Sequence, residues 1–393
     1  MRPPQNATQK PKQYGMMKKI GILGGGQLGR MLLQVAANYP VLTSIMEKDA
    51  DCPSATLCHH FVLGDITNYD DVLQFGEGLD AITIEIENVN IDALYALEAK
   101  GCAIYPKPDA LKTIKNKILQ KEFYHHHQIP SPAFHVVNSH EELNNHVSFL
   151  PAVQKLATGG YDGKGVQVIR QADDLHRGFN APSVLEKMVA IEKELAITVA
   201  IGNDGTAAVY PPVEMVFDQS LNLLDYQICP ANISENILWK AEALALSVAK
   251  NLNSPGIFAV EMFTDNDNNV WVNETAPRVH NSGHHTIEAH YSSQFDMLWR
   301  VMLDYPLGNT QKIMSSVMVN LVGSEGYTGN AVYEGLNEVL SIPNAYVHLY
   351  GKKETKPGRK MGHATIMSED RQELLHQANK IKHTLFVKGD KKI

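Results

Sequence analysis

The chain has 393 residues, enough for two or three domains, and its formal net charge is −8. Hydrophobic residues make up 44 % and charged residues 20 %, as is usual for globular enzymes. The acidic balance argues against a nucleic-acid binder, which needs a basic surface to displace counterions. No apolar run reaches the roughly 20 residues of a membrane-spanning helix. Residues 1–16 lack the apolar core of a signal peptide, so we expect a cytoplasmic protein with a disordered N-terminal extension and no membrane partner.

Residues 17–110 alternate short apolar stretches with amphipathic ones, which predicts a doubly wound parallel sheet. Near its start, the stretch IGILGGGQLGR places Gly24, Gly26 and Gly29 in the G-x-G-x-x-G pattern of dinucleotide-binding loops. Glu47 follows at about 20 residues, the distance expected of a ribose-binding acid. The pattern alone leaves open whether the loop binds NAD or another ligand.

None of the four cysteines belongs to a C-x-x-C pair, which favours reduced thiols in a cytosolic protein. Cys52 and Cys58 lie close to His59 and His60, so a metal site is an alternative interpretation. Their spacing matches no structural zinc pattern, and we prefer the reduced thiols. The remaining cysteines are Cys102 and Cys229.

A helix is predicted after the first unit, in PDALKTIKNKILQKEFYHHHQ, with Asp109 as its N-cap. From about residue 133 the pattern changes to short strands and hairpins, and we assign residues 111–310 to a second domain. Residues 311–393 then form a small third unit, with short strands and one helix.

The hairpin GIFAVEMFTDNDNNVWVNETAP carries two acidic residues in its strands. If Asp267 and Asn268 form a two-residue turn, Glu261 and Glu274 face each other across the strands. Facing like charges destabilise a strand pair, and neither strand carries Lys or Arg. A bound divalent cation such as Mg²⁺ explains this pattern better than a solvated face does.

Two further segments combine polar residues with glycine. TGGYDGKG (residues 158–165) has four glycines, which predicts a flap that folds over phosphates rather than a packed hairpin. It is not a Walker A loop, because no Ser or Thr follows its lysine. NETAPRVHNSGHHT and the later KKETKPGRKMGH carry side chains that suit a phosphate monoester or a reactive anion, although each could be a solvated loop. They are Arg278, His280, Asn281, Ser282, Lys353, Arg359 and Lys360.

Together these features resemble the ATP-grasp superfamily. The motifs GGGQLGRM, TGGYDGKG, NETAPRVHNSGHHT and KPGRKMGH resemble, in order, the signatures of N5-carboxyaminoimidazole ribonucleotide synthases. The resemblance runs from about residue 18 to the last residue. It implies an α/β and α+β architecture, namely an ATP-grasp fold with a Rossmann-like N-terminal domain and a small C-terminal domain. It also implies a homodimeric ligase of purine biosynthesis, which uses ATP and bicarbonate to carboxylate 5-aminoimidazole ribonucleotide through carboxyphosphate.

The resemblance implies a role for each matching residue. Glu261 and Glu274 would hold two Mg²⁺ ions, and the Arg278 to Ser282 segment would handle bicarbonate and the developing anions. Lys117 stands where an arginine is expected, which keeps the charge but loses the planar fork. The implied ATP ligands are Lys117, Lys155, Gly160, Tyr161, Asp162, Gly163, Lys164, Gly165, Glu186, Lys187, Met188, Val189, Glu194, Asn273 and Glu274. The implied substrate ligands are Gly26, Gln27, Leu28, Glu87, Lys353, Arg359 and Lys360.

Several alternatives remain. Within the superfamily these are a formate-dependent glycinamide ribonucleotide transformylase and a biotin-carboxylase-like protein, and the NSGHHT and KPGRKMGH motifs argue against both. An NAD-dependent oxidoreductase has no use for the flap or the paired glutamates. A nucleotide-sensing module with a dead site is disfavoured because the residues required for catalysis are all present.

Overall fold

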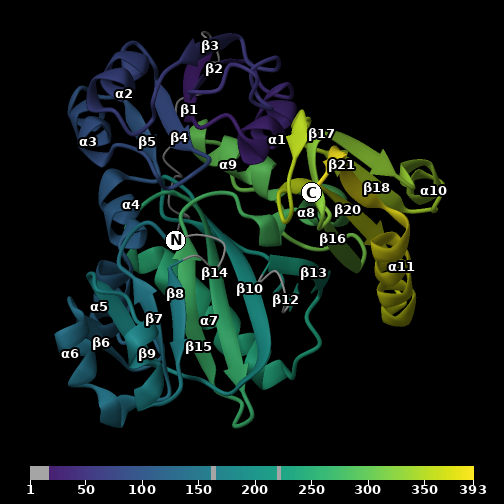
Figure 1. The fold of residues 1–393 in the computed structure, drawn as a ribbon. Helices are drawn as coiled ribbons and strands as arrows, with labels where there is room; N and C mark the ends of the chain where they lie inside the picture. Colours follow the sequence, from purple (N-terminus) through teal and green to yellow (C-terminus); the bar gives the residue numbers. More distant parts are fainter. Residues whose placement is uncertain (1–16, 161–164, 219–222) are drawn as a thin grey trace, which may run out of the picture.

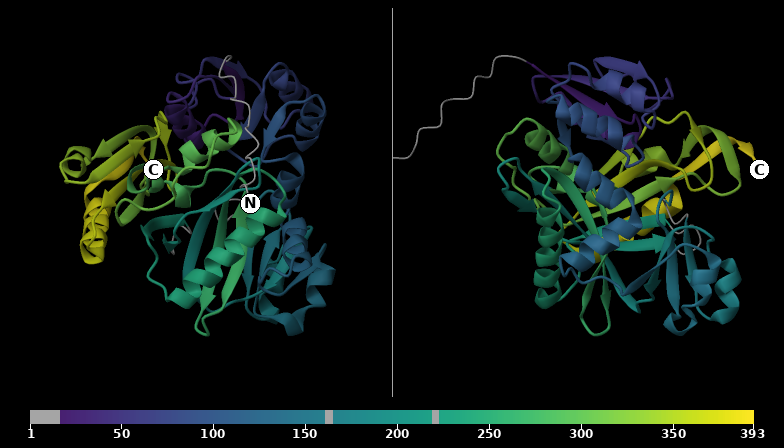
Figure 2. Two further views of the ribbon diagram at one scale, coloured as in Figure 1. Left: turned by 180° about the vertical axis from the view of Figure 1, so that it is seen from behind. Right: turned by 90° about the vertical axis from the view of Figure 1, so that its left-hand side faces the viewer.

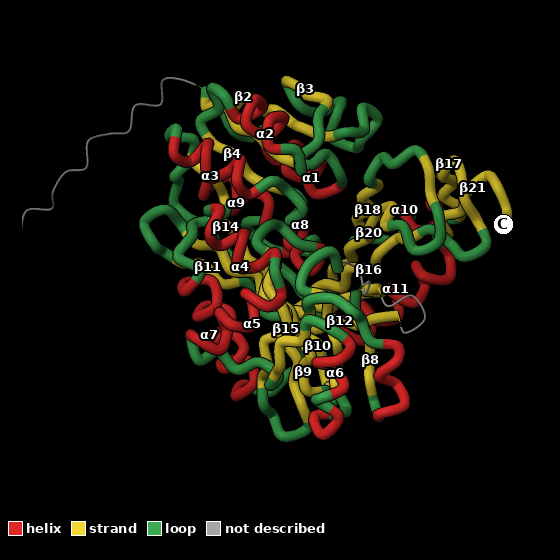
Figure 3. The backbone as a smooth tube through the Cα atoms, turned by 60° about the vertical axis from the view of Figure 1, so that its left-hand side comes forward, coloured by secondary structure: helices red, strands yellow, loops and turns green. Residues whose placement is uncertain are grey.

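Figure 1 shows the computed structural model, which describes residues 17–160, 165–218 and 223–393. An N-terminal unit lies at the top, a middle region lies below it, and C-terminal strands lie to one side. Figure 3 shows strands in all three parts. In the described part of the chain, no helix is both long and apolar enough to cross a membrane. The extension predicted for residues 1–16 lies outside the described residues.

The N-terminal unit is a parallel sheet with the strand order β3-β2-β1-β4-β5. Ile20, Ile22 and Leu23 of the central strand are fully buried, because they pack into cores on the two faces of the sheet. This confirms the predicted doubly wound sheet. The elements are β1 (Lys18–Leu23), α1 (Gln27–Ala36), β2 (Val41–Glu47), β3 (His60–Leu63), α2 (Tyr69–Gly76), β4 (Ala81–Ile84), α3 (Ile91–Ala99) and β5 (Ala103–Tyr105).

Two helices, α4 (Pro108–Lys115) and α5 (Lys117–His126), replace the single helix that we predicted. Asn116 separates them: its extended backbone ends α4, and its side chain accepts hydrogen bonds from the first N–H groups of α5. The N-cap prediction was also wrong, because Lys107 occupies that position and Asp109 lies in the first turn.

The middle region contains two sheets. The smaller has the order β6-β9-β7-β8, and the larger runs β15-β14-β10-β12-β13-β16-β20-β18, with β11 paired to β10. Helix α7 covers one face of the larger sheet, as Figure 2 shows, and buries Ile237, Ala241 and Ala245 there. The elements are β6 (Phe134–Val137), α6 (His140–Asn144), β7 (Ala152–Leu156), β8 (Val166–Ile169), β9 (Ser183–Lys187), β10 (Ile191–Ile201), β11 (Ala207–Val209), β12 (Val213–Asp218), β13 (Leu223–Cys229), α7 (Glu235–Asn251), β14 (Gly256–Asp265), β15 (Val270–Ala276), α8 (Thr286–Ala289) and α9 (Gln294–Met302).

The C-terminal residues do not form a sheet entirely of their own. Strand β16 pairs with β13, so β16, β20 and β18 extend the larger sheet of the middle region. Only β19, β17 and β21 form a separate three-stranded sheet in the described residues. The elements are β16 (Ser316–Val322), β17 (Tyr327–Glu334), α10 (Leu336–Leu340), β18 (Ala345–Leu349), β19 (Glu354–Thr355), β20 (Lys360–Met367), α11 (Arg371–Thr384) and β21 (Phe386–Lys392).

A buried contact between α1 and α9 joins the N-terminal unit to the middle region. The Trp299 indole N–H donates to the Leu32 carbonyl at 2.8 Å, and both residues belong to one apolar core. Because the glycine loop begins α1 and the NSGHHT segment precedes α9, this contact holds the two loops near each other.

Candidate active site

A cavity of about 470 Å³ lies between the two sheets of the middle region. Its apolar lining comes from both, including Val153 and Val168 on one side and Phe263 on the other. Ten of the predicted ATP ligands line this cavity, so the structure brings together residues that are far apart in the chain. They are Lys117, Lys155, Gly160, Glu186, Lys187, Met188, Val189, Glu194, Asn273 and Glu274.

Glu261 and Glu274 are direct cross-strand partners, as predicted, but the turn that joins their strands is different. The Asp265 N–H donates to the Asn269 carbonyl at 3.2 Å, which closes a loop of three residues rather than two. A β-bulge leaves Asn273 without a cross-strand partner and restores the register beyond it. The predicted two-residue turn was therefore wrong. The predicted pairing of Glu261 with Glu274 is nevertheless correct, because the bulge shifts the register by one residue.

The two glutamates differ in charge because their surroundings differ. Burial and the Glu274 carboxylate raise the pKa of Glu261. Lys117 Nζ lies 2.5 Å from Glu274 Oε2, and this ammonium lowers the pKa of Glu274. The Glu274 carboxylate in turn outweighs burial and raises the pKa of Lys117. In the protein alone, Glu274 is the ionised member of the pair.

A second set of charges surrounds Glu186. Lys155 Nζ donates to Glu186 Oε2 at 3.0 Å and to Asn273 Oδ1 at 2.8 Å. Lys121 Nζ lies 3.7 Å from the same Glu186 oxygen, and burial lowers its pKa to about 8. We did not predict Lys121, although it lies one helical turn after Lys117, a spacing that places both on one face of α5.

A second cavity, of about 400 Å³, lies beside the first, between the glycine loop and the NSGHHT segment. Gln27, Leu28 and Glu87 line it, as the predicted substrate site requires. The two cavities meet, because six residues line both. They are Lys117, Gly160, Glu274, His280, Asn281 and Lys360.

The predicted catalytic segment lies where the cavities meet. Arg278 Nε is 2.9 Å from Glu87 Oε1, and His280 Nε2 is 3.7 Å from Glu261 Oε1. The Asn281 amide has no hydrogen-bond partner in the described residues, which suits a group that contacts a ligand. Ser282 lines neither cavity: it is buried, and its N–H donates to His280 Nδ1 at 3.3 Å.

The N–H groups of the glycine loop contact carboxylates. Glu85 accepts from the N–H groups of Gly26 and Gly29, both at 2.5 Å, and Glu47 accepts from Gly25 N–H at 3.1 Å. Glu85 and Glu47 therefore occupy the N–H groups that the pyrophosphate of a dinucleotide would otherwise contact. The Gly26 amide, predicted to bind the substrate phosphate, is occupied by Glu85.

Of the three predicted C-terminal cations, Lys360 alone lines the cavities. Lys353 Nζ lies 2.6 Å from Asp51 Oδ1 on the surface, and Arg359 donates to the Glu354 carbonyl at 2.8 Å. In this structure, Lys353 and Arg359 are therefore not at the predicted substrate site. Their side chains are long and belong to exposed or half-exposed loops, so sequence alone could not place them.

Only part of the predicted flap can be located. Gly160 lines both cavities, and Gly165 has a φ of 77°, which favours glycine. Gly165 lines neither cavity. The predicted ligands Tyr161, Asp162, Gly163 and Lys164 lie outside the described residues.

The residues at the glutamate pair fit Mg²⁺. Carboxylate oxygens are the hard ligands that this ion prefers, and it usually takes one or two of them together with substrate phosphates. The cross-strand repulsion that raises the pKa of Glu261 is what a dication would relieve. Glu261 and Glu274 are the residues that would hold it.

Three family models match the chain in succession. They are the ribonucleotide synthetase preATP-grasp domain (residues 17–115), the ATP-grasp domain (122–295) and the phosphoribosylaminoimidazole carboxylase C-terminal domain (316–377). Among solved structures, N5-carboxyaminoimidazole ribonucleotide synthetase from Thermotoga maritima is 38 % identical, with a TM-score of 0.89, over 95 % of this chain and 100 % of that one. An Aspergillus clavatus synthase in complex with ADP and 5-aminoimidazole ribonucleotide is 32 % identical, with a TM-score of 0.86, over 94 % and 98 %.

Curated relatives agree with this. The phosphoribosylaminoimidazole carboxylase of Vigna aconitifolia is 34 % identical over 88 % of this chain, and the chain spans 64 % of that protein's length. It likewise spans 64 % of the Candida glabrata carboxylase. The N5-carboxyaminoimidazole ribonucleotide synthase of Bacillus subtilis is 33 % identical over 91 % of this chain and 93 % of its own length. The chain therefore belongs to the N5-carboxyaminoimidazole ribonucleotide synthase family of ATP-grasp proteins.

Proposed function

We propose that this chain catalyses the ATP-dependent carboxylation of 5-aminoimidazole ribonucleotide by bicarbonate, which yields N5-carboxyaminoimidazole ribonucleotide. The observation that carries the proposal is the meeting of two cavities at Glu274, His280 and Asn281. A nucleotide in one cavity and a ribonucleotide in the other would share this junction. The Aspergillus clavatus relative in complex with ADP and 5-aminoimidazole ribonucleotide supports the same assignment.

ATP fits the cavity between the two sheets. The apolar side chains from both sheets would enclose adenine, beside the Glu186 to Val189 strand end, and Glu194 would bind the ribose hydroxyls. Lys155 and Lys117 would contact the phosphates. Lys155 is already held in place by Glu186 and Asn273, so little side-chain entropy is lost when it binds an anion.

Glu261 and Glu274 would hold the Mg²⁺, which neutralises phosphate charge in phosphoryl transfer. The family resemblance implies two ions, and the two carboxylates offer enough oxygens to share them with substrate phosphates. If Glu274 held a metal ion, Lys117 would be released from it and could turn to the phosphates of a nucleotide in the same cavity.

The reaction would take place where the cavities meet. A bicarbonate oxygen attacks the γ-phosphorus, and ADP leaves with formation of carboxyphosphate. This intermediate then breaks down to CO₂ and inorganic phosphate, and the exocyclic amine of the ribonucleotide attacks CO₂ with loss of a proton. Arg278, His280 and Asn281 would bind the anions, and Glu87, which pairs with Arg278, lines the second cavity. Exclusion of water matters because it would hydrolyse carboxyphosphate.

The N–H groups of Gln27 and Leu28, at the start of α1, would bind the ribonucleotide phosphate, since both residues line the second cavity. Lys360 would supply a positive charge at the same site, while Lys353 and Arg359 would need to move to reach it. The domain boundaries 17–110, 111–310 and 311–393 remain part of the proposal, and the three family models match residues 17–115, 122–295 and 316–377. A homodimer in the cytoplasm remains part of the proposal, supported by the resemblance.

The decisive experiment measures phosphate release with ATP, Mg²⁺ and bicarbonate, with and without 5-aminoimidazole ribonucleotide. We expect turnover only when the ribonucleotide is present. Omission of bicarbonate should abolish product formation. Turnover with formate and glycinamide ribonucleotide instead would assign the chain to the transformylases, and tight NAD binding without ATP turnover would contradict the proposal altogether.

A further inference from the structure

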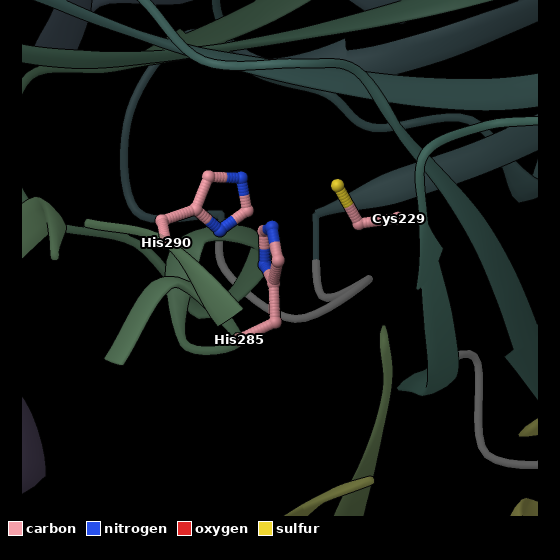
Figure 4. A group of neighbouring side chains, drawn as sticks. All are labelled: Cys229, His285 and His290. Carbon is pink, nitrogen blue, oxygen red and sulfur yellow. The ribbon is translucent and has the colours of Figure 1, made fainter. Parts of the chain in front are cut away.

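Three side chains that bind soft metals converge beside the active-site loop. Cys229 ends β13, while His285 and His290 flank the short helix α8. One ligand atom of each lies within 4.8 Å of the other two. The residues are 1 %, 2 % and 3 % exposed, so the cluster is shielded from solvent. Figure 4 shows the His285 ring between the His290 ring and the Cys229 sulfur.

Several polar atoms here have no hydrogen-bond partner in the described part of the chain. They are His285 Nε2, both ring nitrogens of His290, and Ser316 Oγ. Ser316 is the cross-strand partner of Cys229, so the two side chains lie on one face of the sheet. A buried polar group without a partner destabilises the folded protein. A metal ion would satisfy one nitrogen of each histidine at once.

Gln227 Nε2 lies 3.0 Å from His285 Nδ1 and also donates to the Ser282 carbonyl at 2.6 Å. Because an amide nitrogen only donates, His285 Nδ1 accepts here and the other ring nitrogen, Nε2, carries the proton. Rotation of the Gln227 amide, whose Oε1 has no partner in the described residues, would let Nδ1 donate and free Nε2 for a metal, as at other metal-binding histidines. In a tetrahedral zinc site, bound nitrogen and sulfur atoms lie about 3.3–3.6 Å apart. Shifts of about 1 Å in the side chains would bring this cluster to that spacing.

One cation lies nearby and must be compatible with a metal. Lys312 forms a backbone bridge with His290, but its Nζ donates to Ser315 Oγ at 3.1 Å and lies 3.7 Å from Glu369 Oε2. Its charge is therefore partly offset by Glu369. The thiolate of Cys229 would offset one of the two charges of the ion.

We propose that Cys229, His285 and His290 bind one Zn²⁺, with Ser316 Oγ or water as the fourth ligand. Imidazole and thiolate are the ligands that structural zinc sites use. The ion would fasten the segment that carries His280 and Asn281 to strand β13, and would thus support the active-site loop without touching substrate. This inference depends on the cluster alone and not on the proposed reaction.

The test uses the full chain, stripped with a chelator and then dialysed against Zn²⁺ in the presence of excess Mg²⁺, which occupies the glutamate pair. We expect one zinc per chain by elemental mass spectrometry and a higher melting temperature. Co²⁺ as a probe should give tetrahedral d–d bands and a thiolate charge-transfer band. Cys229→Ala should abolish that band and weaken zinc binding by about 100-fold, equivalent to about 2.7 kcal/mol. Cys102→Ala, at a buried cysteine outside the cluster, should change neither.

Three results would overturn the proposal. They are a wild-type chain that takes up no zinc, a Co²⁺ spectrum without a thiolate band, and zinc binding that is unchanged in Cys229→Ala. If Cys229→Ala does not fold, the Co²⁺ spectrum of the wild-type chain still decides, and His290→Gln provides a second variant with the same expected loss.

Discussion

Lys117 forms an ion pair with one of the two facing glutamates of the candidate active site. Its ammonium keeps Glu274 ionised, while Glu261 is the member whose pKa is raised. An arginine at this position would spread its charge over a planar fork and could contact both an acid and a phosphate. Lysine has one ammonium group, so in the proposed reaction Lys117 would have to leave Glu274 in order to contact the nucleotide.

The two glutamates should respond differently to neutralisation. Glu261→Gln replaces a carboxyl whose pKa is raised by burial and by Glu274, so its charge contributes little and we expect the free energy of unfolding at neutral pH to change by less than about 0.5 kcal/mol. Glu274→Gln removes the partner of Lys117 and should cost roughly 1 kcal/mol, a modest value because the pair is partly exposed. Both should lower turnover by about 100-fold or more, equivalent to about 2.7 kcal/mol.

Urea unfolding and phosphate release measure these effects. Near wild-type turnover of either variant at saturating Mg²⁺ would contradict the metal assignment. Equal stability losses would contradict the difference in charge state.

Gly26 tests the glycine loop. An added Cβ at this position would lie 2.5 Å from Glu85 Oε1, so Gly26→Ala should displace Glu85 and crowd the approach to the Gln27 and Leu28 amides. We expect the KM for 5-aminoimidazole ribonucleotide to rise about tenfold, equivalent to about 1.4 kcal/mol. The KM for ATP should change little, because its cavity lies between the sheets of the middle region. A parallel rise of both KM values in a folded variant, checked by circular dichroism, would show that the loop is not a dedicated substrate site.

Among the helices, α5 depends on its N-cap. Asn116 satisfies two N–H groups and sets the direction from which Lys117 enters the cavity. Asn116→Ala should therefore cost about 1 kcal/mol of stability. It should also raise the KM for ATP. Asn116→Asp keeps a capping oxygen and is the matched control, expected to retain both properties. If the alanine variant loses stability but binds ATP normally, the cap has no role in placing Lys117.

The elements also show what sequence can and cannot predict. The glycine-rich loops and the facing glutamates were predictable as functional features, because glycines weaken a strand pair and facing carboxylates repel each other. The bulge at Asn273 was not predictable. It arises from a shift in the pairing register between β14 and β15, which the residue pattern of either strand alone does not indicate. Glu85 was missed although it follows β4 at the carboxyl edge of the sheet, where ligands bind in such folds. The contact of Lys117 with Glu274 joins positions 157 residues apart, which no local pattern encodes.

For the molecule as a whole, buried titratable groups set the pH dependence of stability. Burial lowers the pKa of His284, His285, His290 and His363 below the usual 6.5. The unfolded chain therefore binds more protons than the folded protein as the pH falls below 6.5, and stability is lost there. Glu194 affects the pH dependence of stability in the opposite direction. Burial raises its pKa to about 7, so its contribution to the free energy of unfolding is lost as the pH rises from about 4.5 through 7.

Burial also raises the pKa of Glu85 and of Glu261, so the four histidines oppose three glutamates. We expect maximal stability near neutral pH. Each net proton taken up on unfolding should lower the free energy of unfolding by about 1.4 kcal/mol per pH unit on the acid side. Urea unfolding over this range, in chelator to exclude bound metal, gives the slope. His363→Gln should reduce the slope, whereas His126→Gln, at an exposed position, should leave it unchanged. A flat profile below pH 6.5 would contradict the buried neutral histidines.

The ladder between β13 and β16 also limits how this chain can be recombined. Four residue pairs join the strands, from Tyr226 with Val319 to Cys229 with Ser316. A truncation at the start of the C-terminal unit would make β13 an edge strand of the larger sheet. Its unpaired backbone N–H and C=O groups could then pair with strands of other chains. A chimera with a relative should therefore exchange β13 and β16 together. The family models divide the sequence into three segments. The hydrogen bonds between β13 and β16 nevertheless make the last two segments one unit for recombination.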